Sequence, residues 1–333
     1  MNERLISKYR TEIMGFAALW IGVLHAQMWF RFPLLQAYKL SGQGGVDLFL
    51  FLSGFGLYYA YQKGERGLVF YGKRMLRILP LYIPAVIARC YYFHYDLKWS
   101  LMFATSISFW TGFDRSYWYV GAVFVLYAIA PLYLKYFKDG REEKMTICAM
   151  AVALLVSLLF WHTTQLIFFV RVAIYFLGFY AGKRAYHNDP PIPGLTWKAV
   201  VSFVIGAVWL YLAFRFDHDE VILYGMGMYW YPNLLIIPPL CLFLSRAFEW
   251  LEAHRCGWYV KVHHAMGEAS LAIYLLHDLC MKYFTPRIHI PASLSYNGIL
   301  LHVLILILTV IISWIYQKAV FMIIGLIGKG KTA

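Results

Sequence analysis

The chain is divided into ten long apolar stretches, each close to the length that an α-helix needs to cross a bilayer. Such a helix takes about 20 residues to cross the ~30 Å of hydrocarbon. Of the 333 residues, 61% are hydrophobic and 14% are charged, a composition that excludes a soluble globular protein. We therefore predict an all-α, polytopic integral membrane helix bundle of about ten transmembrane helices, in a single membrane-embedded domain over residues 1–333. The stretches lie at about residues 11–30, 44–62, 78–93, 117–136, 145–161, 166–183, 197–214, 222–247, 268–284 and 299–327.

An eleventh apolar segment, near residues 100–110, is too short to cross the bilayer. It also contains Thr105, Ser106 and Ser108, which interrupt its apolar character. We predict a short interfacial or re-entrant segment here.

The positive charge of the chain is distributed as in a membrane protein. With 30 Lys and Arg against 17 Asp and Glu, the formal net charge is +13. If the N-terminus is cytoplasmic and ten segments cross, 21 basic residues fall in inside segments and 7 in outside ones. A further crossing at 100–110 would change this to 12 inside and 16 outside. Because Lys and Arg are retained on the cytoplasmic side, we predict ten crossings of the cytoplasmic membrane with both termini cytoplasmic. The charge then indicates contact with the lipid bilayer, and we expect no nucleic acid partner.

The five cysteines do not form a metal or disulfide pattern. They are scattered along the chain with no CxxC pair. We expect them to be small buried hydrophobic residues, and we expect neither a metal site nor a permanently bound cofactor.

Two ionisable residues stand at the outer ends of the first two stretches. His25 lies about 21 Å along a helix that starts at residue 11, and an imidazole can act as a general base near neutral pH. Asp47 begins the next stretch after a short connection, where its carboxylate could orient the ring of His25. We predict that both are catalytic. The alternatives are a histidine hydrogen-bonded between helices and an acid favoured by the helix dipole.

A basic cluster begins the third stretch at its cytoplasmic end. Arg74 and Arg77 are three residues apart and so share one helical face, with Lys73 beside them. Guanidinium groups bind phosphate in a bidentate manner, so this cluster is a candidate phosphate site. Anchoring by the positive-inside rule is a second reading, and the two are compatible.

Arg171 lies a few residues inside the sixth stretch. A buried arginine in a membrane needs an anionic or polar partner, and it usually marks a functional path. Asp47 and the acidic loop at 217–220 are the candidate partners. Alternatively, the side chain reaches the outer interface by snorkelling.

Further polar and aromatic residues are candidates for the acceptor site or the lining of a pore. Tyr274 and His277 are three residues apart and share a face of the ninth stretch. Trp118 begins the fourth stretch, and Ser53 lies in the middle of the second. Packing between helices, and an aromatic belt in the case of Trp118, are the alternative explanations.

Taken in order, these segments resemble acyltransferase family 3, the integral-membrane acyltransferases that modify bacterial surface carbohydrates. GGVDLFLFLSGF followed by FYGKRMLRILPLY is the most specific part of the resemblance. The segments that carry it are residues 14–26, 44–55, 70–82, 117–133, 171–183 and 270–279.

The resemblance implies a ten-helix bundle that takes an acyl group from cytoplasmic acyl-CoA. The acceptor is a hydroxyl of a carbohydrate or glycolipid, as in O-acetylation of cell-envelope polysaccharide. It also implies that His25 is the catalytic histidine and that Arg74 and Arg77 bind the donor. The family usually has an arginine eleven residues before the histidine, where this chain has Met14. Either Arg10, one turn earlier on roughly the same face, takes that place, or donor binding differs.

A transporter or flippase is the main alternative from another functional class. Intramembrane charges suit alternating access, and 231–233 and 238–239 interrupt the eighth stretch with proline. No matching interruption or inverted repeat occurs elsewhere. A structural membrane subunit would not explain the placement of the charges. We therefore predict an acyltransferase that transfers a group other than an aminoacyl group, most simply acetyl.

Overall fold

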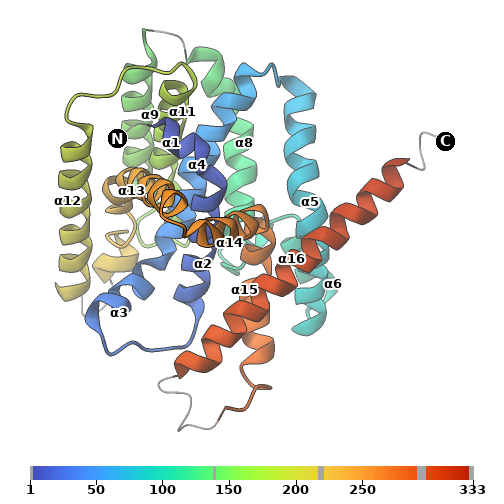
Figure 1. The fold of residues 1–333 in the computed structure, drawn as a ribbon. Helices are drawn as coiled ribbons and strands as arrows, with labels where there is room; N and C mark the ends of the chain where they lie inside the picture. The colour runs from blue at the N-terminus through green and yellow to red at the C-terminus, as the bar shows by residue number, and fades with distance from the viewer. Residues whose placement is uncertain (1–2, 138–139, 217–220, 291–297, 330–333) are drawn as a thin grey trace.

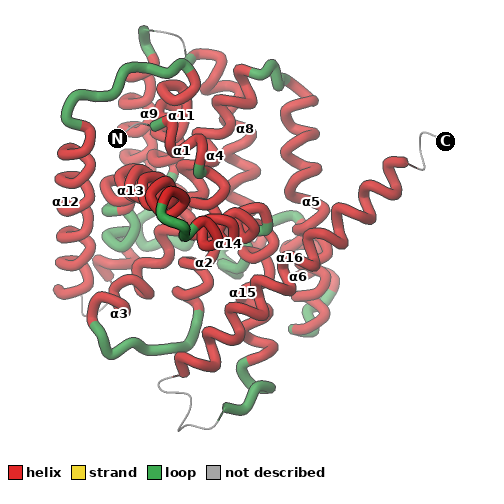
Figure 2. The backbone as a smooth tube through the Cα atoms, in the orientation of Figure 1, coloured by secondary structure: helices red, strands yellow, loops and turns green. Residues whose placement is uncertain are grey.

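The computed structural model describes residues 3–137, 140–216, 221–290 and 298–329, and over these ranges the regular structure is helical, without strands (Figures 1 and 2). The all-α prediction is therefore confirmed. The helices are α1 (Arg4–Lys8), α2 (Arg10–His25), α3 (Pro33–Leu40), η1 (Ser41–Gln43), α4 (Gly44–Gln62), α5 (Gly67–Tyr92), α6 (Leu97–Ala104), α7 (Ile107–Trp110), α8 (Trp118–Tyr136), α9 (Glu142–Leu158), α10 (Leu166–Phe169), α11 (Val172–Tyr186), α12 (Leu195–Phe216), η2 (Val221–Gly225), α13 (Asn233–Ala253), α14 (Gly257–Glu268), α15 (Ser270–Phe284) and α16 (Ile299–Lys329).

Each predicted apolar stretch contains a long helix, but fewer than ten of these helices have the length and composition of a membrane span. In the described part of the chain, five pass both criteria, namely 118–136, 166–186, 195–216, 233–253 and 299–326. The helices α2, α9 and α15 have only 16, 17 and 15 residues. In α5 the charged cluster lowers the hydropathy, and in α4 the glycines and tyrosines do so.

Several predicted ends of the stretches are wrong. The first stretch was expected to reach residue 30, but α2 ends at His25 because Ala26 adopts an extended backbone. The third was expected to begin at residue 78, but α5 begins at Gly67, so the basic cluster lies within the helix. Residues 100–110 form two short helices, α6 and α7, as expected of a segment that does not span. Helix α14 lies where a loop was expected.

Two helices at the edge of the bundle present apolar side chains outward, as lipid-facing helices do. In α12 only 17% of the span is buried in the protein, and in α16 only 28%. Figure 1 shows the carboxyl-terminal part of α16 projecting away from the other helices. Exposed Ile311, Ile315 and Met322 on α16 suit contact with acyl chains.

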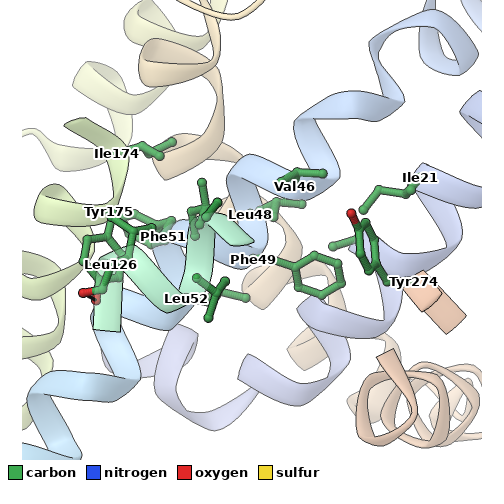
Figure 3. Packing of buried hydrophobic residues seen from close by; sticks show 14 of the residues in the cluster. Ile21, Val46, Leu48, Phe49, Phe51, Leu52, Leu126, Ile174, Tyr175 and Tyr274 are labelled. Atoms are coloured by element: carbon green, nitrogen blue, oxygen red, sulfur yellow. Dashed lines mark hydrogen bonds between the residues drawn. The ribbon is translucent and has the colours of Figure 1, made fainter. Parts of the chain in front are cut away.

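The centre of the bundle is α4, which contacts α2, α8, α11 and α13. A Cβ atom at Gly54 would overlap the carbonyl oxygen of Tyr175, so only glycine allows α4 and α11 to approach this closely. Figure 3 shows Phe51 beside Tyr175 on this side of α4. On another side of α4, Phe49 lies near Tyr274 of α15 (Figure 3).

Helix α2 packs against α4, α14 and α15. A Cβ at Gly267 would overlap the Thr11 carbonyl oxygen, which shows how closely the α14–α15 corner approaches α2. This packing positions His277 of α15 beside His25 at the carboxyl end of α2, with 4.7 Å between the ring centroids.

Candidate active site

Three adjoining cavities lie along α2 and share lining residues. The basic cavity, about 330 Å³, is at the amino end of α2. The middle cavity, about 120 Å³, shares Arg10, Ser53, Arg77 and Tyr127 with it. The histidine cavity, about 300 Å³, is at the carboxyl end of α2 and shares Tyr274 with the middle cavity. The five lining residues that the cavities share come from five different helices, and the fold brings them together along one row of cavities.

The basic cavity contains most of the predicted donor-binding residues. Arg10, Arg74 and Arg77 line it together with Lys63 and Glu65, which the sequence analysis did not single out. Arg74 Nη2 donates to Glu65 Oε2 at 2.6 Å, and Lys73 Nζ donates to Glu65 Oε1 at 2.8 Å. One acid among four cations leaves this cavity positively charged, as a phosphate site requires.

Lys73 does not line any of the three cavities, so the structure does not group it with Arg10, Arg74 and Arg77, and its role in donor binding stays a prediction. Its ammonium is about half exposed and bonds Glu65 from outside the cavity at 2.8 Å. Position 73 lies only about 40° around the helix from Arg77, so its place outside the cavity comes from the outward course of its side chain to Glu65 and not from the helical face. The hydrogen bond from Lys73, followed by the positive charges of Arg74 and Lys73, holds the pKa of Glu65 below its usual value.

Arg10 is the basic residue of α2 that enters the row of cavities. It lines both the basic and the middle cavity, whereas Met14, one turn later, lines only the middle cavity. Its Nε donates to the carbonyl of Leu52 at 3.2 Å. A Cβ at Gly56 would overlap the guanidinium of Arg10, so the glycine makes room for it.

The histidine cavity contains two imidazole rings. The His277 Nδ1 lies 2.6 Å from the carbonyl oxygen of Tyr274. Because a carbonyl can only accept, Nδ1 carries the proton and Nε2 of the neutral ring is an acceptor. Within the described ranges the side chain of His25 makes no hydrogen bond, so its ring nitrogens are available to a ligand in the cavity.

Asp47 does not orient His25, and this part of the prediction is wrong. Its carboxylate is fully buried and accepts from Arg171 Nε at 3.1 Å and from Asn233 Nδ2 at 2.8 Å. Arg171 also donates to the Ile167 carbonyl at 2.7 Å and to Gln43 Oε1 at 3.3 Å. Asp47 therefore neutralises Arg171 rather than acting on the histidine, and it is absent from the cavity lining. The alternative partner loop at 217–220 lies outside the described residues.

Arg171 and Trp118, both predicted, line the histidine cavity. The Arg171 guanidinium carbon lies 5.0 Å from the Trp118 ring centroid and 5.4 Å from that of Trp230. Snorkelling does not occur, because the Arg171 side chain is only 1% exposed. Arg171 and Trp118 form part of the cavity wall, and Asp47 and Trp230, which do not line the cavity, contact the guanidinium of Arg171.

The sequence analysis missed a second ionic group in the histidine cavity. Arg89 Nη1 bonds Asp278 Oδ2 at 2.7 Å, and Lys282 Nζ lies 3.1 Å from the same oxygen. Arg89 Nη2 also donates to Ser116 Oγ at 2.6 Å. Arg89 and Asp278 are opposite charges in two different apolar stretches, and matching such charges would have found the pair.

In the part of the chain that the structure describes, no three His, Cys, Asp or Glu side chains lie together as metal ligands would. The polar groups that line the cavities include hydroxyl, imidazole and guanidinium groups and one carboxylate in each cavity, from Glu65, Glu268 and Asp278.

Residues 14–318 match the family model of an acyltransferase domain, that of acyltransferase family 3. The chain belongs to this family. No curated protein and no solved structure matches it. The match covers nearly the whole chain, so the resemblance seen in the sequence is confirmed, and the protein is a membrane acyltransferase. Arg10 lies outside the matched residues, and Met14 is the first residue within them.

Proposed function

We propose that the protein transfers an acyl group, most simply acetyl, from cytoplasmic acyl-CoA to a hydroxyl of a cell-surface or lipid-linked carbohydrate. The observation that carries this proposal is the row of three cavities, with cations at one end and two histidines at the other. A long donor with phosphates at one end and a thioester at the other fits such an arrangement.

The phosphates of the donor bind in the basic cavity. Arg10, Arg74 and Arg77 present guanidinium groups there, and Lys63 adds an ammonium. Planar guanidinium groups are suited to bidentate phosphate binding. From Arg10 to His25 the helix rises by about 22 Å, which the pantetheine arm must cover.

The pantetheine arm lies in the middle cavity. Ser53 and Tyr127 line its entrance from the basic cavity, and Tyr274 lies between it and the histidine cavity. The hydroxyl of Tyr274 accepts a hydrogen bond from the backbone N–H of Tyr119 at 3.3 Å. The thioester reaches His25 by passing along the Tyr274 ring.

In the chemical step, His25 accepts the proton of the acceptor hydroxyl as its oxygen attacks the thioester carbonyl. A carbon–oxygen bond forms and the carbon–sulfur bond breaks. The departing CoA thiolate receives the proton, so the products are an ester and free CoA. The hydroxyl of Tyr274, which lines the histidine cavity, supplies a hydrogen bond to the developing oxyanion.

This reaction fixes the orientation of the protein in the cytoplasmic membrane. Acyl-CoA is cytoplasmic, so the basic cavity faces the cytoplasm and the histidine cavity faces the outside. The segments predicted on the basic-cavity side contain 21 basic residues and those on the other side contain 7, which supports this orientation.

The test is acyl transfer by the purified full chain in lipid nanodiscs. Radiolabelled acetyl-CoA is supplied with a cell-envelope glycan extract, and alkali-labile label on carbohydrate is measured. We expect wild-type protein and the exposed-histidine control His289→Ala to label the glycan, and His25→Ala not to. Solute uptake without acyl-CoA and without labelled glycan would instead support a transporter.

A further inference from the structure

The outer mouth of the histidine cavity contains more cations than acids. Arg89, Arg115 and Lys282 line it, with Asp278 as the acid among the lining residues. The fourth lining cation, Arg171, is already matched by a buried carboxylate at 3.1 Å. The excess of positive charge therefore comes from Arg89, Arg115 and Lys282 and not from Arg171.

One carboxylate cannot neutralise both cations that share it. Asp278 Oδ2 accepts from Arg89 at 2.7 Å and from Lys282 at 3.1 Å. The Arg89 side chain is 3% exposed, and its Nε has no hydrogen-bond partner. A buried guanidinium with an unsatisfied N–H gains free energy when an anion approaches.

Arg115 adds a third cation at the same mouth. Its side chain is exposed, and within the described ranges it forms no ion pair. The neighbouring Asp114 uses its carboxylate to accept from the backbone N–H of Ser116. Even with Asp114 counted, three cations face two carboxylates.

Membrane topology does not explain these cations. Basic residues are disfavoured on the outer side, where this chain has only seven. Two of the seven, Arg115 and Lys282, line the histidine cavity. Cations that gather around one cavity, on the side where they are otherwise scarce, indicate an anionic ligand.

We propose that the acceptor carbohydrate carries an anionic group, a carboxylate or a phosphate, which binds Arg115 and Lys282 while its hydroxyl faces His25. This inference rests on the proposed function and specifies its substrate class. The charge-assisted hydrogen bonds fix the position of the sugar, and the fixed position brings one hydroxyl to the imidazole. Neutral sugars lack this anchor.

The test is equilibrium binding of three probe sugars to the purified full chain, measured by saturation-transfer NMR. The probes are methyl glucuronoside, glucose 1-phosphate and methyl glucoside, which present a carboxylate, a phosphate and no charge. We expect at least one anionic sugar to bind about tenfold more tightly than methyl glucoside. The comparison of the two anionic probes identifies which group the acceptor carries.

The variants Arg115→Gln and Lys282→Gln should each remove most of this preference and leave acetyl-CoA binding unchanged. Lys98→Gln is the matched control, because it removes an exposed cation from an outside segment without lining the cavity. Size-exclusion profiles and acetyl-CoA affinity verify that the variants fold. Equal binding of the three sugars, no binding of either anionic sugar, or the same loss in Lys98→Gln would overturn the inference. Failure of the acyl-transfer assay, in contrast, would count against the proposed function, because sugar binding needs no turnover.

Discussion

The two end cavities contain the same ionic motif in different surroundings. In the basic cavity, Glu65 is shared by Lys73 and Arg74, and in the histidine cavity Asp278 is shared by Arg89 and Lys282. Both ends carry an excess of positive charge. Only the histidine cavity also contains imidazole rings.

The two end cavities therefore differ in what they can do: one is suited to binding, and the other to proton transfer as well. Arginine and lysine hold their protons at neutral pH, and the carboxylate in the basic cavity, Glu65, is engaged by two cations, so this cavity is suited to binding an anion rather than to accepting a proton from a hydroxyl. The histidine cavity can do both, and its wall is held by a buried ion pair, Asp47–Arg171, that has no counterpart at the other end. Substitutions at the two ends should therefore change different quantities.

The largest effect is expected at His25. His25→Ala should lower kcat by about 10²–10⁴-fold, the usual contribution of a general base, while the Kd of acetyl-CoA stays as in wild type. Steady-state transfer and equilibrium binding measure the two quantities. A loss of acetyl-CoA binding in this variant would contradict the separation of the two ends.

The second effect is on stability, at the wall of the histidine cavity. Asp47→Ala leaves the buried guanidinium of Arg171 without its carboxylate and should lower the free energy of unfolding by about 3–5 kcal/mol. Chemical denaturation in detergent measures this loss. The double variant Asp47→Leu/Arg171→Met removes both charges and should recover much of it. If the double variant is as unstable as the single one, the ion pair is not the cause.

The third effect concerns the donor alone. Arg77→Gln should raise the Kd of acetyl-CoA by about tenfold, because Arg77 lines both the basic and the middle cavity. Arg66→Gln removes a nearby exposed arginine that lines neither cavity, so it should leave the Kd unchanged. Equal effects of the two variants would show that surface charge, and not the cavity, attracts the donor.

The smallest effect is a pH dependence of stability from Glu65. Its pKa is lowered in the folded protein, so its ion pairs stabilise the protein above the usual pKa of 4.5 and this stabilisation is lost as the pH falls through the lower folded value. Wild type should exceed Glu65→Gln by about 1 kcal/mol or less at pH 7, and this difference should close as the pH falls from 4.5 through the lowered pKa of Glu65. Glu143→Gln, at an exposed acid, should show no such difference. A gap between wild type and Glu65→Gln that widens on acidification would show that the sign is wrong.

Much of the fold could be predicted because a membrane restricts the composition of each helix. The second stretch was predicted at 44–62, and α4 has these same bounds. Ends such as that of α2 could not be predicted, since Trp29 and Phe30 continue the apolar pattern after the helix has stopped at His25. The start of α5 was missed because the charged residues near its amino end lower the hydropathy without ending the helix.

Within the site, the sequence identified residue types but not their pairing. His25, Arg77 and Tyr274 were singled out, and all three line the cavities. The partner of Asp47 is 124 positions away in the chain, and only the packing of α4 against α11 selects Arg171 over His25. Asn233, which also donates to Asp47, begins α13 directly after Pro232. The sequence analysis had interpreted the proline interruption at 231–233 only as a feature that suits a transporter.

A donor that reaches from the basic cavity to His25 must pass through the middle cavity, and the variant Ser53→Phe probes this passage. Ser53 lines both the basic and the middle cavity, and a phenyl ring there would fill the narrow passage. Acyl transfer from acetyl-CoA and binding of 3′-phosphoadenosine diphosphate, the nucleotide part of CoA, are measured on the same samples, with Ser53→Ala as control. We predict that Ser53→Phe retains nucleotide binding and loses transfer, while Ser53→Ala retains both. Wild-type transfer by Ser53→Phe would show that the acyl group takes another route.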